Sequence, residues 1–359
     1  MKVPAQLLTR QVKAIFEAWG MKGEQVDIIV RMLLAADLRG IDSHGIALLP
    51  LYDEFRLAGK LTLNPEIKIL RETPATALFD GGGGLGHYPS FKAMNLAIEK
   101  CLASGIGSVA VRNSNHYGAA GVYALLAAER GCIGLSTSSV WRQTVVPTFG
   151  VEPVFGTNPI AFAAPAGSHP PFCLDMATST VALGKIKLAA MNGTPINPGW
   201  AVDAEGETIT EPQEALKHGS MTPLGGTAEM SSHKGYGLGA LVEILSTVLP
   251  GAFFATTRSR RHPNSDRYNV GHFFLALDPR AFRAEGEFEE DLADLIDTLH
   301  TTKRADENQP VLVPGDPERA CCEERSRDGI PIPLPLAQQI RGVAEASGAP
   351  YLLDDSHFG

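Results

Sequence analysis

Segments with helical periodicity alternate with short apolar segments typical of strands along most of this chain, and no segment is repeated. The spacing of apolar residues predicts helices at 5–19, 24–39, from the loop 41–45 to about 58, and at 89–103, 119–129, 234–249 and 287–301. It predicts strands at 76–80, 108–112 and 271–278, several short strands within 131–183, and no regular element in the polar, Gly/Pro-rich stretch 192–228. The tail is expected to hold a loop, one short helix and a loose end. Alternation without repetition predicts a mixed α/β fold.

The composition is that of a globular protein. The chain has 359 residues, of which 44% are hydrophobic and 20% charged, enough for two domains or one large one. Its 31 Lys and Arg residues against 40 Asp and Glu residues give a formal net charge of −9. Because nucleic acids and anionic membranes attract basic surfaces, this charge disfavours both as partners. An anionic ligand would need a local basic site.

The sequence also bears on where the protein resides. The first six residues lack the apolar stretch of a signal peptide. The most apolar window, 238–255, contains Glu243 and Pro250 and therefore fails as a membrane span. We expect a cytoplasmic protein.

Metal and hydrolase motifs are missing from the sequence. The five cysteines include no Cys-x-x-Cys pair, and no His-x-x-x-His or His-Glu-x-x-His pattern occurs, so we expect no metal. Neither a Gly-x-Ser-x-Gly elbow nor a phosphate-binding loop of the Gly-x-x-x-x-Gly-Lys type is present, which disfavours hydrolases and nucleoside triphosphatases.

A glycine motif at Gly81, Gly83 and Gly86 matches the Gly-x-Gly-x-x-Gly pattern of Rossmann dinucleotide-binding folds, and it lies between an expected strand and an expected helix. In that setting backbone amides at the start of the helix hold a pyrophosphate. The acidic residue that should close the second strand is absent, since that strand ends in Arg112 and Asn113. The alternative is a structural loop that needs the conformational freedom of glycine.

Two of the ten histidines lie in loops that suit a ligand. His44 follows Ser43 at the entry to a helix, and His116 lies in a polar turn between a strand and a helix. An imidazole whose pKa lies near neutrality can give or take the proton that accompanies hydride transfer at a carbonyl carbon. The alternative for each is a histidine that only satisfies loop carbonyls.

The remaining histidines have simpler interpretations. His272 lies in an expected strand and is expected to be packed and hydrogen-bonded. His233 precedes Lys234 at a helix start, where a lysine either pairs with phosphate or is solvated. No role is expected for the histidines in loops or on surface helices, namely His87, His169, His218, His262, His300 and His357.

Eight separated motifs, in order over about residues 5–345, resemble the malate/L-lactate dehydrogenase family. This non-Rossmann group includes sulfolactate, ureidoglycolate and diketogulonate enzymes and cyclic imino-acid reductases. The motifs are AADLRGIDSHG (35–45), RNSNHYG (112–118), GTNP (156–159), LDMATS (174–179), KGYG (234–237), GHF (271–273), RAD (304–306) and PG (314–315).

The resemblance implies an oxidoreductase that uses NAD or NADP to interconvert a 2-oxo acid, or a cyclic imino acid, with its reduced form. It implies a mixed sheet with helices on both sides, similar to sulfolactate dehydrogenase, and an interlocked homodimer. The glycine motif then becomes a structural loop. We expect an N-terminal helical segment at 1–75, an α/β segment carrying the His116 loop at 76–130, a cofactor-binding domain at 131–250, and a C-terminal segment at 251–359 that returns to the first domain.

The same resemblance assigns roles to individual residues. His44 and His116 match the family's two active-site histidines, and either could donate the proton. Asp175 would accept a hydrogen bond from His44 and fix its tautomer, while Ser43 would hold the substrate or relay the proton. The cofactor would contact Thr157, Asn158, Asp175, Met176, Ala177, Thr178, Ser179, His233, Lys234, Gly235 and Gly315.

One position departs from the family pattern. Members commonly carry an arginine four residues after the first histidine, where it grips the substrate carboxylate, and this chain has Leu48. If 44–58 is helical, His44, Leu48 and Tyr52 share one face. Since leucine cannot replace a bidentate cation, either another cation such as Arg142 takes over or the substrate is bulkier and more apolar than malate or lactate. Two other hypotheses stay open, a Rossmann-type dehydrogenase that uses Gly81–Gly86 and a non-catalytic sensor that binds a dinucleotide or metabolite.

Overall fold

The computed structural model describes residues 2–254 and 268–353. The helices are α1 (Ala5–Ala18), α2 (Glu24–Leu38), η1 (Asp42–His44), η2 (Ile46–Leu48), α3 (Leu49–Leu57), α4 (His87–Ser104), α5 (Gly121–Ala128), α6 (Leu183–Asn192), α7 (Pro212–His218), α8 (Ser232–Glu243), η3 (Ile244–Val248), η4 (Pro279–Ala281), α10 (Glu287–Thr301), α11 (Asp316–Asp328) and α12 (Leu334–Ser347). The strands are β1 (Lys2–Val3), β2 (Lys68–Glu72), β3 (Thr76–Asp80), β4 (Ile106–Ser114), β5 (Ile133–Ser138), β6 (Ile160–Ala166), β7 (His169–Met176), β8 (Ala201–Val202), β9 (Thr208–Ile209), β10 (Ser220–Met221), β11 (Val270–Leu277) and β12 (Ile330–Pro331).

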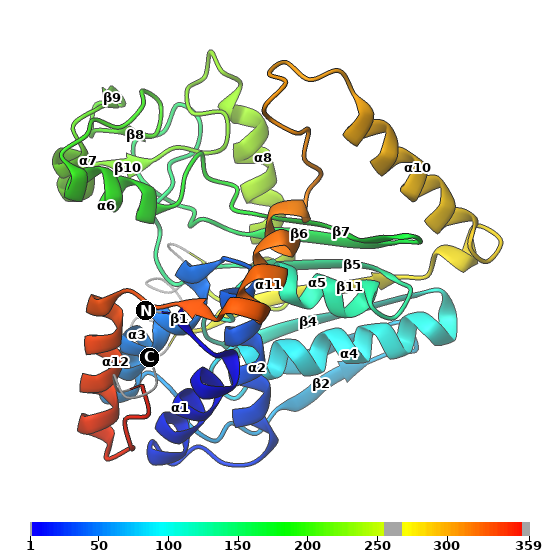
Figure 1. The fold of residues 1–359 in the computed structure, drawn as a ribbon, viewed down its shortest axis with the longest axis horizontal. Coiled ribbons are helices and arrows are strands. Elements are labelled where there is room, and N and C mark those ends of the chain that lie inside the picture. Colours follow the sequence, from blue (N-terminus) through cyan, green and yellow to red (C-terminus); the bar gives the residue numbers. More distant parts are fainter. Residues whose placement is uncertain (1, 255–267, 354–359) are drawn as a thin grey trace.

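A seven-stranded mixed sheet forms the centre of the molecule (Figure 1). Its strand order is β2-β3-β4-β11-β5-β6-β7, in which β3 and β4 are parallel and the other neighbours are antiparallel. Among the described strands, β3 and β4 are the only parallel neighbours, and the antiparallel β11 lies between β4 and β5, so the sheet lacks the run of adjacent parallel strands of a Rossmann fold. The expected mixed, non-Rossmann α/β fold is confirmed.

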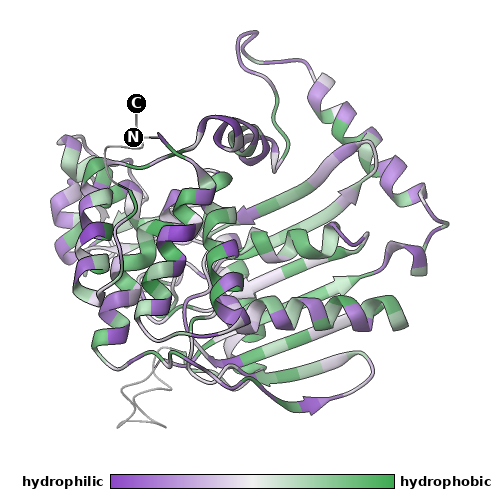
Figure 2. Cartoon of the chain, turned by 60° about the horizontal axis from the view of Figure 1, so that its bottom comes forward, coloured by the Kyte–Doolittle hydropathy of each residue, from purple (hydrophilic) through white to green (hydrophobic). Residues whose placement is uncertain are grey.

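Helices cover both faces of this sheet, and two glycines allow them to approach. A Cβ atom on Gly134 in β5 would meet the Ala124 carbonyl of α5, and one on Gly271 in β11 would meet the Ser246 carbonyl of η3. Gly134 pairs with Ala276 of β11, which lies an odd number of residues from Gly271, so α5 and η3 lie on opposite faces. Figure 2 shows that the central strands between them are largely hydrophobic.

The loops that carry the sequence motifs meet at one end of the sheet. β3, β4, β5 and β7 run in the same direction and end there, whereas β6 and β11 run the opposite way and begin there. The loops that follow or precede these strand ends are 81–86, 113–118, 139–144, 157–159 and 177–180. The sheet therefore gathers segments that are up to about a hundred residues apart in the sequence.

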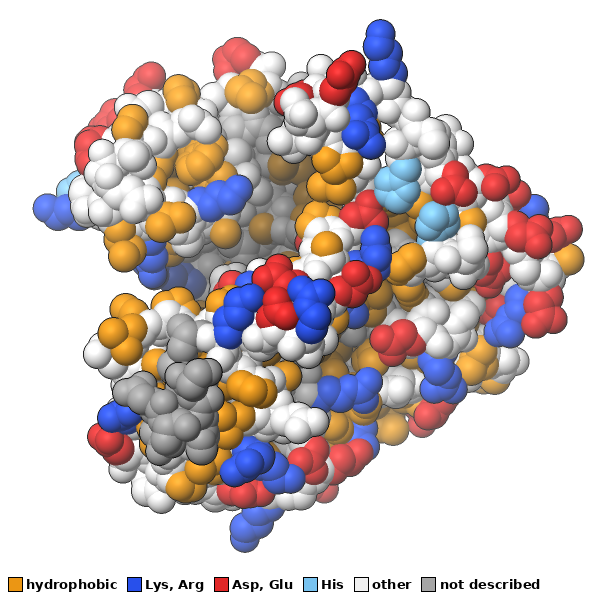
Figure 3. Space-filling view, in the orientation of Figure 1, with side chains coloured by type: hydrophobic (Ala, Val, Ile, Leu, Met, Phe, Trp, Pro, Cys, Tyr) orange, Lys and Arg blue, Asp and Glu red, His pale blue; other side chains and the backbone are white. Residues whose placement is uncertain are grey.

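Two lobes flank this end of the sheet. Helices α1, α2, α3 and α12 enclose an apolar core that includes Phe16, Leu33 and Ile340, and β1 pairs with β12 beside them. The smaller lobe holds α6, α7 and the sheet β10-β8-β9 around Ile186 and Met221. Figure 3 shows a hollow between the two lobes on the face in view.

The structure differs from the sequence expectations in the stretch 192–228 and in the tail. Helix α7 and the short strands β8, β9 and β10 lie in that stretch, for which no regular element was expected, and α6 lies beside it. The tail carries two helices, α11 and α12, in place of one short one. Helix α11 has no buried residue and is rich in charge, so it lacks the apolar periodicity by which helices are recognised. Within the described residues, no helix combines the length and apolarity needed to cross a membrane.

Candidate active site

The glycine-rich loop after β3 supports the loop that carries His116. The amide of Gly81 donates to the Arg112 carbonyl (2.8 Å), that of Gly83 to Asn113 (2.7 Å), and that of Gly86 to His116 (2.9 Å). The Gly82 amide donates to the Asp80 carboxylate at 2.9 Å. These donors are used inside the protein, so they are not available to a pyrophosphate. The glycine motif is a structural loop, and the Rossmann interpretation of it is wrong.

His116 is held in one tautomer by two neighbours. The Tyr52 hydroxyl lies 2.8 Å from its Nδ1 atom, and the Gly118 amide donates to the same nitrogen at 3.3 Å. Because a backbone N–H can only donate, Nδ1 is an acceptor, and the proton of the neutral ring is on Nε2. Burial lowers the pKa of His116 well below its usual value, and burial also raises the pKa of Tyr52 well above its usual value. The pair is therefore a neutral imidazole and a protonated phenol near neutral pH.

His44 lies beside His116. The two imidazole rings are stacked with centroids 5.6 Å apart, and Nδ1 of His44 lies 2.8 Å from the hydroxyl of Ser43. Ser43 is exposed, and its hydroxyl can act as donor or acceptor. Burial lowers the pKa of His44 below 6.5. His44 can therefore change protonation state without breaking a fixed hydrogen bond.

Asp37 shapes the loop that carries His44. It is 2% exposed, and its Oδ2 atom accepts the amide of Ile46 at 2.9 Å. A Cβ atom on Gly45 would collide with the Asp37 carboxylate, so the loop passes close over it. Arg325 of α11 clamps the same loop from outside by donating to the Asp37 carbonyl and to the Asp42 carboxylate.

Asp175 does not make the expected hydrogen bond to His44. Its Oδ2 atom accepts the amide of Gly121, the first residue of α5, at 2.7 Å. Among the residues that the structure describes, no hydrogen bond joins Asp175 to His44. Desolvation raises the pKa of Asp175 to about 6.

The expected helical face of His44, Leu48 and Tyr52 is also different. His44 belongs to η1 and Leu48 to η2, and the α-helix begins at Leu49, with Pro50 in its first turn where proline is tolerated. Tyr52 reaches His116 from this helix. Leu48 is partly buried, whereas Arg142 is exposed and pairs with no carboxylate among the described residues.

The residues expected to contact the cofactor form two connected groups. In the first, the Thr178 amide donates to the Thr157 carbonyl at 2.9 Å, and its hydroxyl donates to the Asn158 carbonyl at 3.1 Å. Asn158 is fully buried, with its Nδ2 atom donating to Gly239 (3.1 Å) and Glu243 (2.6 Å), both in α8. Its Oδ1 atom is buried and accepts no hydrogen bond from any described residue.

The second group is the start of α8. A Cβ atom on Gly235 would meet the backbone of Leu224, and the Leu224 amide donates to the Thr178 carbonyl at 2.9 Å. The first turn of α8 thus lies beside the turn that contains Thr178. His233 and Lys234 are exposed there, and no carboxylate among the described residues pairs with Lys234.

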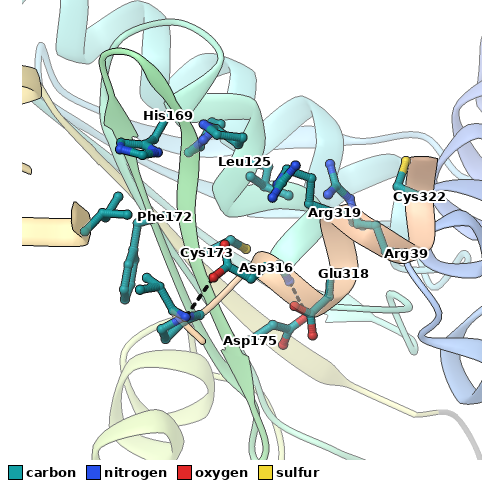
Figure 4. A pocket seen from close by; sticks show the side chains of 18 of the residues that line it. Arg39, Leu125, His169, Phe172, Cys173, Asp175, Asp316, Glu318, Arg319 and Cys322 are labelled. Atoms are coloured by element: carbon teal, nitrogen blue, oxygen red, sulfur yellow. Dashed lines mark hydrogen bonds between the residues drawn. The ribbon is translucent and has the colours of Figure 1, made fainter. Parts of the chain in front are cut away.

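Gly315 and Asp175 line one cavity of about 290 Å³ (Figure 4). The Cys173 amide donates to the Pro314 carbonyl at 3.1 Å, which holds the start of α11 against β7. Arg39 and Arg319 lie on the side of the cavity away from Phe172, and Glu318 points toward Asp175. The nearby charge of Glu318 adds to the raised pKa of Asp175.

Three residues of the site escaped the sequence analysis. His87 was expected to have no role, but it is fully buried at the start of α4 and its ring contacts Tyr52 (5.8 Å between centroids). Neither of its ring nitrogens has a hydrogen-bond partner in the part of the chain that the structure describes. Asp37 lay inside a recognised motif but received no role. Trp141 packs edge-on against His116, with centroids 5.5 Å apart. The contacts of His87 and Trp141 follow from no local pattern, because each joins segments far apart in the sequence. The contact of Asp37 with Ile46 depends on how the loop between them folds.

The remaining histidines behave largely as expected. His272 is fully buried, with Nδ1 2.8 Å from the Ser138 hydroxyl and Nε2 2.9 Å from the Ser114 hydroxyl, which confirms a packed, hydrogen-bonded residue. His262 and His357 lie outside the described residues. No group of three or more metal-ligating side chains occurs in the described ranges.

Comparisons with known proteins agree over nearly the whole chain. Residues 3–341 match the family described as malate/L-lactate dehydrogenase. A malate dehydrogenase of Pyrococcus abyssi is 40% identical, and the match covers 97% of this chain and 95% of that protein. The sulfolactate dehydrogenase structure from Methanocaldococcus jannaschii has a TM-score of 0.88 at 34% identity and covers 98% of both chains. The Δ1-piperideine-2-carboxylate reductase of Pseudomonas syringae pvar. tomato has a TM-score of 0.83 at 28% identity, covering 96% of this chain and all of that one.

Proposed function

Because this chain belongs to the malate/L-lactate dehydrogenase family of NAD(P)-dependent oxidoreductases, we propose that it interconverts the 2-oxo and 2-hydroxy forms of a small carboxylic acid, or a cyclic imino acid and its reduced form. The observation that carries the proposal is the stacked pair of His44 and His116, with Tyr52 on the second ring. Because the two imidazoles have different hydrogen-bond partners, one can donate a hydrogen bond to the substrate carbonyl group and the other can donate a proton to it.

The two histidines divide the work. His116 is fixed as an acceptor at Nδ1, so its Nε2–H can donate a hydrogen bond to the substrate oxygen or nitrogen and stabilise the charge that develops there. Protonating His116 would place an N–H opposite the Gly118 amide, which disfavours it as the acid. His44 has the adaptable Ser43 hydroxyl at Nδ1 and is our candidate for the proton donor.

Ser43 and Asp175 support this arrangement. Ser43 is exposed and linked to His44, so it can pass a proton between that ring and solvent. Asp175 holds the amide of Gly121, which begins the helix directly after the His116 loop. We assign Asp175 a positioning role there, since a carboxylate at a helix start is favoured by the helix dipole.

The cofactor supplies or accepts the hydride at the 2-position when it is bound. The described residues suit such a group. The unpartnered Oδ1 of buried Asn158 is an acceptor within the turn assigned to the nicotinamide end, together with Thr157 and residues 176–179. Lys234, beside His233 and Gly235 at the start of α8, is exposed and pairs with no carboxylate of residues 2–254 and 268–353, so its ammonium can bind a phosphate. Gly315, at the start of α11, lines the same cavity as Asp175. Most of these contacts fall within the proposed cofactor-binding segment 131–250.

Leu48 sets the substrate apart from malate and lactate in this proposal. Family members commonly bind the substrate carboxylate with an arginine at this position, and this chain has an apolar side chain there. Another cation must therefore bind the carboxylate. We propose Arg142, which is exposed and directly follows Trp141, the ring against His116. Replacing Arg142 by alanine should raise KM for the acid more than it lowers kcat.

Turnover tests the proposal directly. Purified protein is mixed with NADH or NADPH and a panel of pyruvate, oxaloacetate, larger 2-oxo acids and cyclic imino acids, and the loss of nicotinamide absorbance is followed. His44→Ala should lower kcat by about 10²- to 10⁴-fold. The control is His218→Ala, because His218 is exposed at the end of α7. Activity that survives in His44→Ala would contradict the assigned role.

The alternatives make different predictions in the same assay. A sensor would bind the dinucleotide and turn over no acid in the panel. Our proposal expects turnover of at least one acid in the panel, together with a loss of dinucleotide binding in Lys234→Ala, measured by nicotinamide fluorescence.

A homodimer belongs to the same proposal. Helix α8 and the following η3 present an exposed apolar stripe of Leu241 (41% exposed), Ile244 (57%) and Val248 (58%), spaced three and four residues apart. Exposed stripes of this kind mark association surfaces. Light scattering should give twice the mass of 38.3 kDa, and Ile244→Lys should shift it toward the monomer.

A further inference from the structure

Trp141 occupies a place in the site that the proposed reaction leaves without a role. It lies in the loop after β5, is partly exposed, and points its ring at His116, with 5.5 Å between centroids and an interplanar angle of 86°. An aromatic ring that contacts an imidazole at the reacting centre borders the space where the substrate is bound. Its partial exposure leaves apolar surface for a ligand to cover.

The backbone that leads into Trp141 is held in place. The Ser139 amide donates to the Gly271 carbonyl at 3.0 Å, and the Gly271 amide donates back to the Ser139 hydroxyl at 3.1 Å. A Cβ atom on Gly156 would meet the Val140 side chain, so the two loops are in close contact there. The loop that carries the indole is therefore hydrogen-bonded to β11 at Ser139, two residues before Trp141.

Two further aromatic rings support the indole from behind. Phe55 packs edge-on against it at 5.4 Å, and Tyr268 lies 6.0 Å away. Phe55 and Tyr268 also contact each other at 5.1 Å, and Phe55 is only 5% exposed. Offset and edge-on aromatic contacts of this kind stabilise a ring in one orientation. Trp141 is thus a rigid apolar wall beside His116.

Among the described residues, the side chains that pack around this wall are largely apolar. Leu48, which packs on the same apolar cluster as Trp141 and Tyr268, stands in place of the family's arginine. The Lys60 ammonium lies behind Tyr268 in the sequence of contacts, donating to its hydroxyl at 3.3 Å with 5.0 Å to its ring centroid, and it keeps its charge. A substrate with a charged second group would lose hydration against this surface, whereas an apolar group would gain contacts.

We propose that Trp141 is a specificity-determining residue that selects 2-oxo acids with an apolar, ring-sized substituent on the carbon next to the carbonyl. This inference rests on the proposed oxidoreductase function and narrows its substrate class. Apolar pockets discriminate by about 10- to 200-fold for small differences in the group they receive. The preference for a substrate with a whole ring over one with a methyl or carboxylate group should reach at least the lower part of that range.

The first experiment compares kcat/KM for phenylpyruvate, pyruvate and oxaloacetate in the wild type and in Trp141→Ala. We expect the wild type to favour phenylpyruvate by about tenfold or more and Trp141→Ala to lose most of that preference. Trp141→Phe should keep it. The matched control is Trp200→Ala, because Trp200 packs in the core of the small lobe, and its ratio of kcat/KM values should equal that of the wild type.

A second experiment reads binding without turnover. The chain has three tryptophans, so Trp19→Phe combined with Trp200→Phe leaves Trp141 as the only indole. Phenyllactate should change the fluorescence of this variant in the presence of oxidised cofactor, and malate should not. If no acid is turned over but this change occurs, the proposed function fails and the assigned site for the ring stands.

Two results would overturn the inference while leaving the oxidoreductase intact. One is a wild type that turns over oxaloacetate or pyruvate better than phenylpyruvate. The other is an unchanged substrate preference in Trp141→Ala, together with no fluorescence response of Trp141 to phenyllactate.

Discussion

The Tyr52 hydroxyl lies 2.8 Å from Nδ1 of His116, on the same ring nitrogen that the Gly118 amide approaches at 3.3 Å. Tyr52 comes from α3 in the helical lobe, and His116 comes from the loop after β4 in the sheet. One hydrogen bond thus joins the two parts of the molecule at the site and fixes the tautomer that leaves Nε2–H free for the substrate.

Tyr52→Phe removes that hydroxyl and leaves the ring in place. Because the Gly118 amide still points at Nδ1, the tautomer is retained, and the loss should be close to one hydrogen bond, about 1 kcal/mol or about fivefold in kcat/KM. The measurement is kcat/KM for the best substrate. Tyr351→Phe is the control, because that hydroxyl donates only to the Ala337 carbonyl in the helical lobe. Equal losses in both variants would mean that the hydroxyl acts on stability and not on His116.

The pH dependence should separate the two histidines. Burial lowers the pKa of His44 below 6.5, so this ring is mostly neutral at pH 7. If His44 donates the proton in reduction, kcat/KM for reduction should fall as pH rises through that pKa, and kcat/KM for oxidation should rise to a plateau above it. His44→Ala should abolish this dependence. A limb that persists in His44→Ala and vanishes in His116→Ala would exchange the two roles.

The periodic elements of the fold could be predicted, and the reason is local. The strand at 76–80 and the helices at 5–18 and 24–38 have apolar residues at the spacing of their own structure, so a short window contains the signal. Helix α11 could not be predicted in this way, because none of its residues is buried. It is held instead by contacts such as that of Arg325 with the loop of His44.

In the candidate site, too, the residues in local sequence motifs could be predicted and the contacts that depend on the tertiary fold could not. His44 and His116 were found because they lie in motifs. Tyr52 was expected to share a helical face with His44 and Leu48, and its contact with His116 was not predicted. The contact of Trp141 with His116 could not be predicted, because it depends on which loops meet at the end of the sheet. The hydrogen bond expected between His44 and Asp175 was wrong for a related reason, since the amide at the start of α5 occupies the carboxylate.

Gly45→Ala should disturb the loop of His44. The new Cβ atom would collide with the Asp37 carboxylate, which is buried and holds the Ile46 amide, so the backbone must shift. Overpacking of this kind costs about 1–3 kcal/mol, and the shift also moves His44. Urea unfolding should show the loss of stability and the turnover assay a fall in kcat. In contrast, Gly342→Ala in α12 has open space around its Cβ and should gain about 0.5–1 kcal/mol.

Asp37 should make the protein less stable as the pH rises. Burial raises its pKa in the folded state from 3.8 to about 7, so the folded chain binds a proton between these values that the unfolded chain has lost. Stability therefore falls as pH increases from about 4 to about 7, by at most about 4 kcal/mol, and is level above that window. Asp37→Asn keeps an acceptor for the Ile46 amide and cannot ionise. The midpoint of thermal unfolding should fall less between pH 5 and 8 in this variant than in the wild type, and identical curves would refute the assignment.

Lys234→Ala should weaken the binding of the dinucleotide without affecting the fold. Lys234 is exposed in the first turn of α8, beside the turn of Thr178, and no carboxylate among the described residues competes for it. A charged hydrogen bond to phosphate contributes about 1.5–3 kcal/mol, so Kd should rise by about tenfold or more. Fluorescence titration with NADH and NADPH at two salt concentrations measures it, and the variant should show the weaker dependence on salt, because one ionic contact is gone. Lys217→Ala in α7 is the matched control for an exposed lysine on the neighbouring lobe. If both variants bound the dinucleotide as the wild type does, the phosphate would have to lie away from the start of α8.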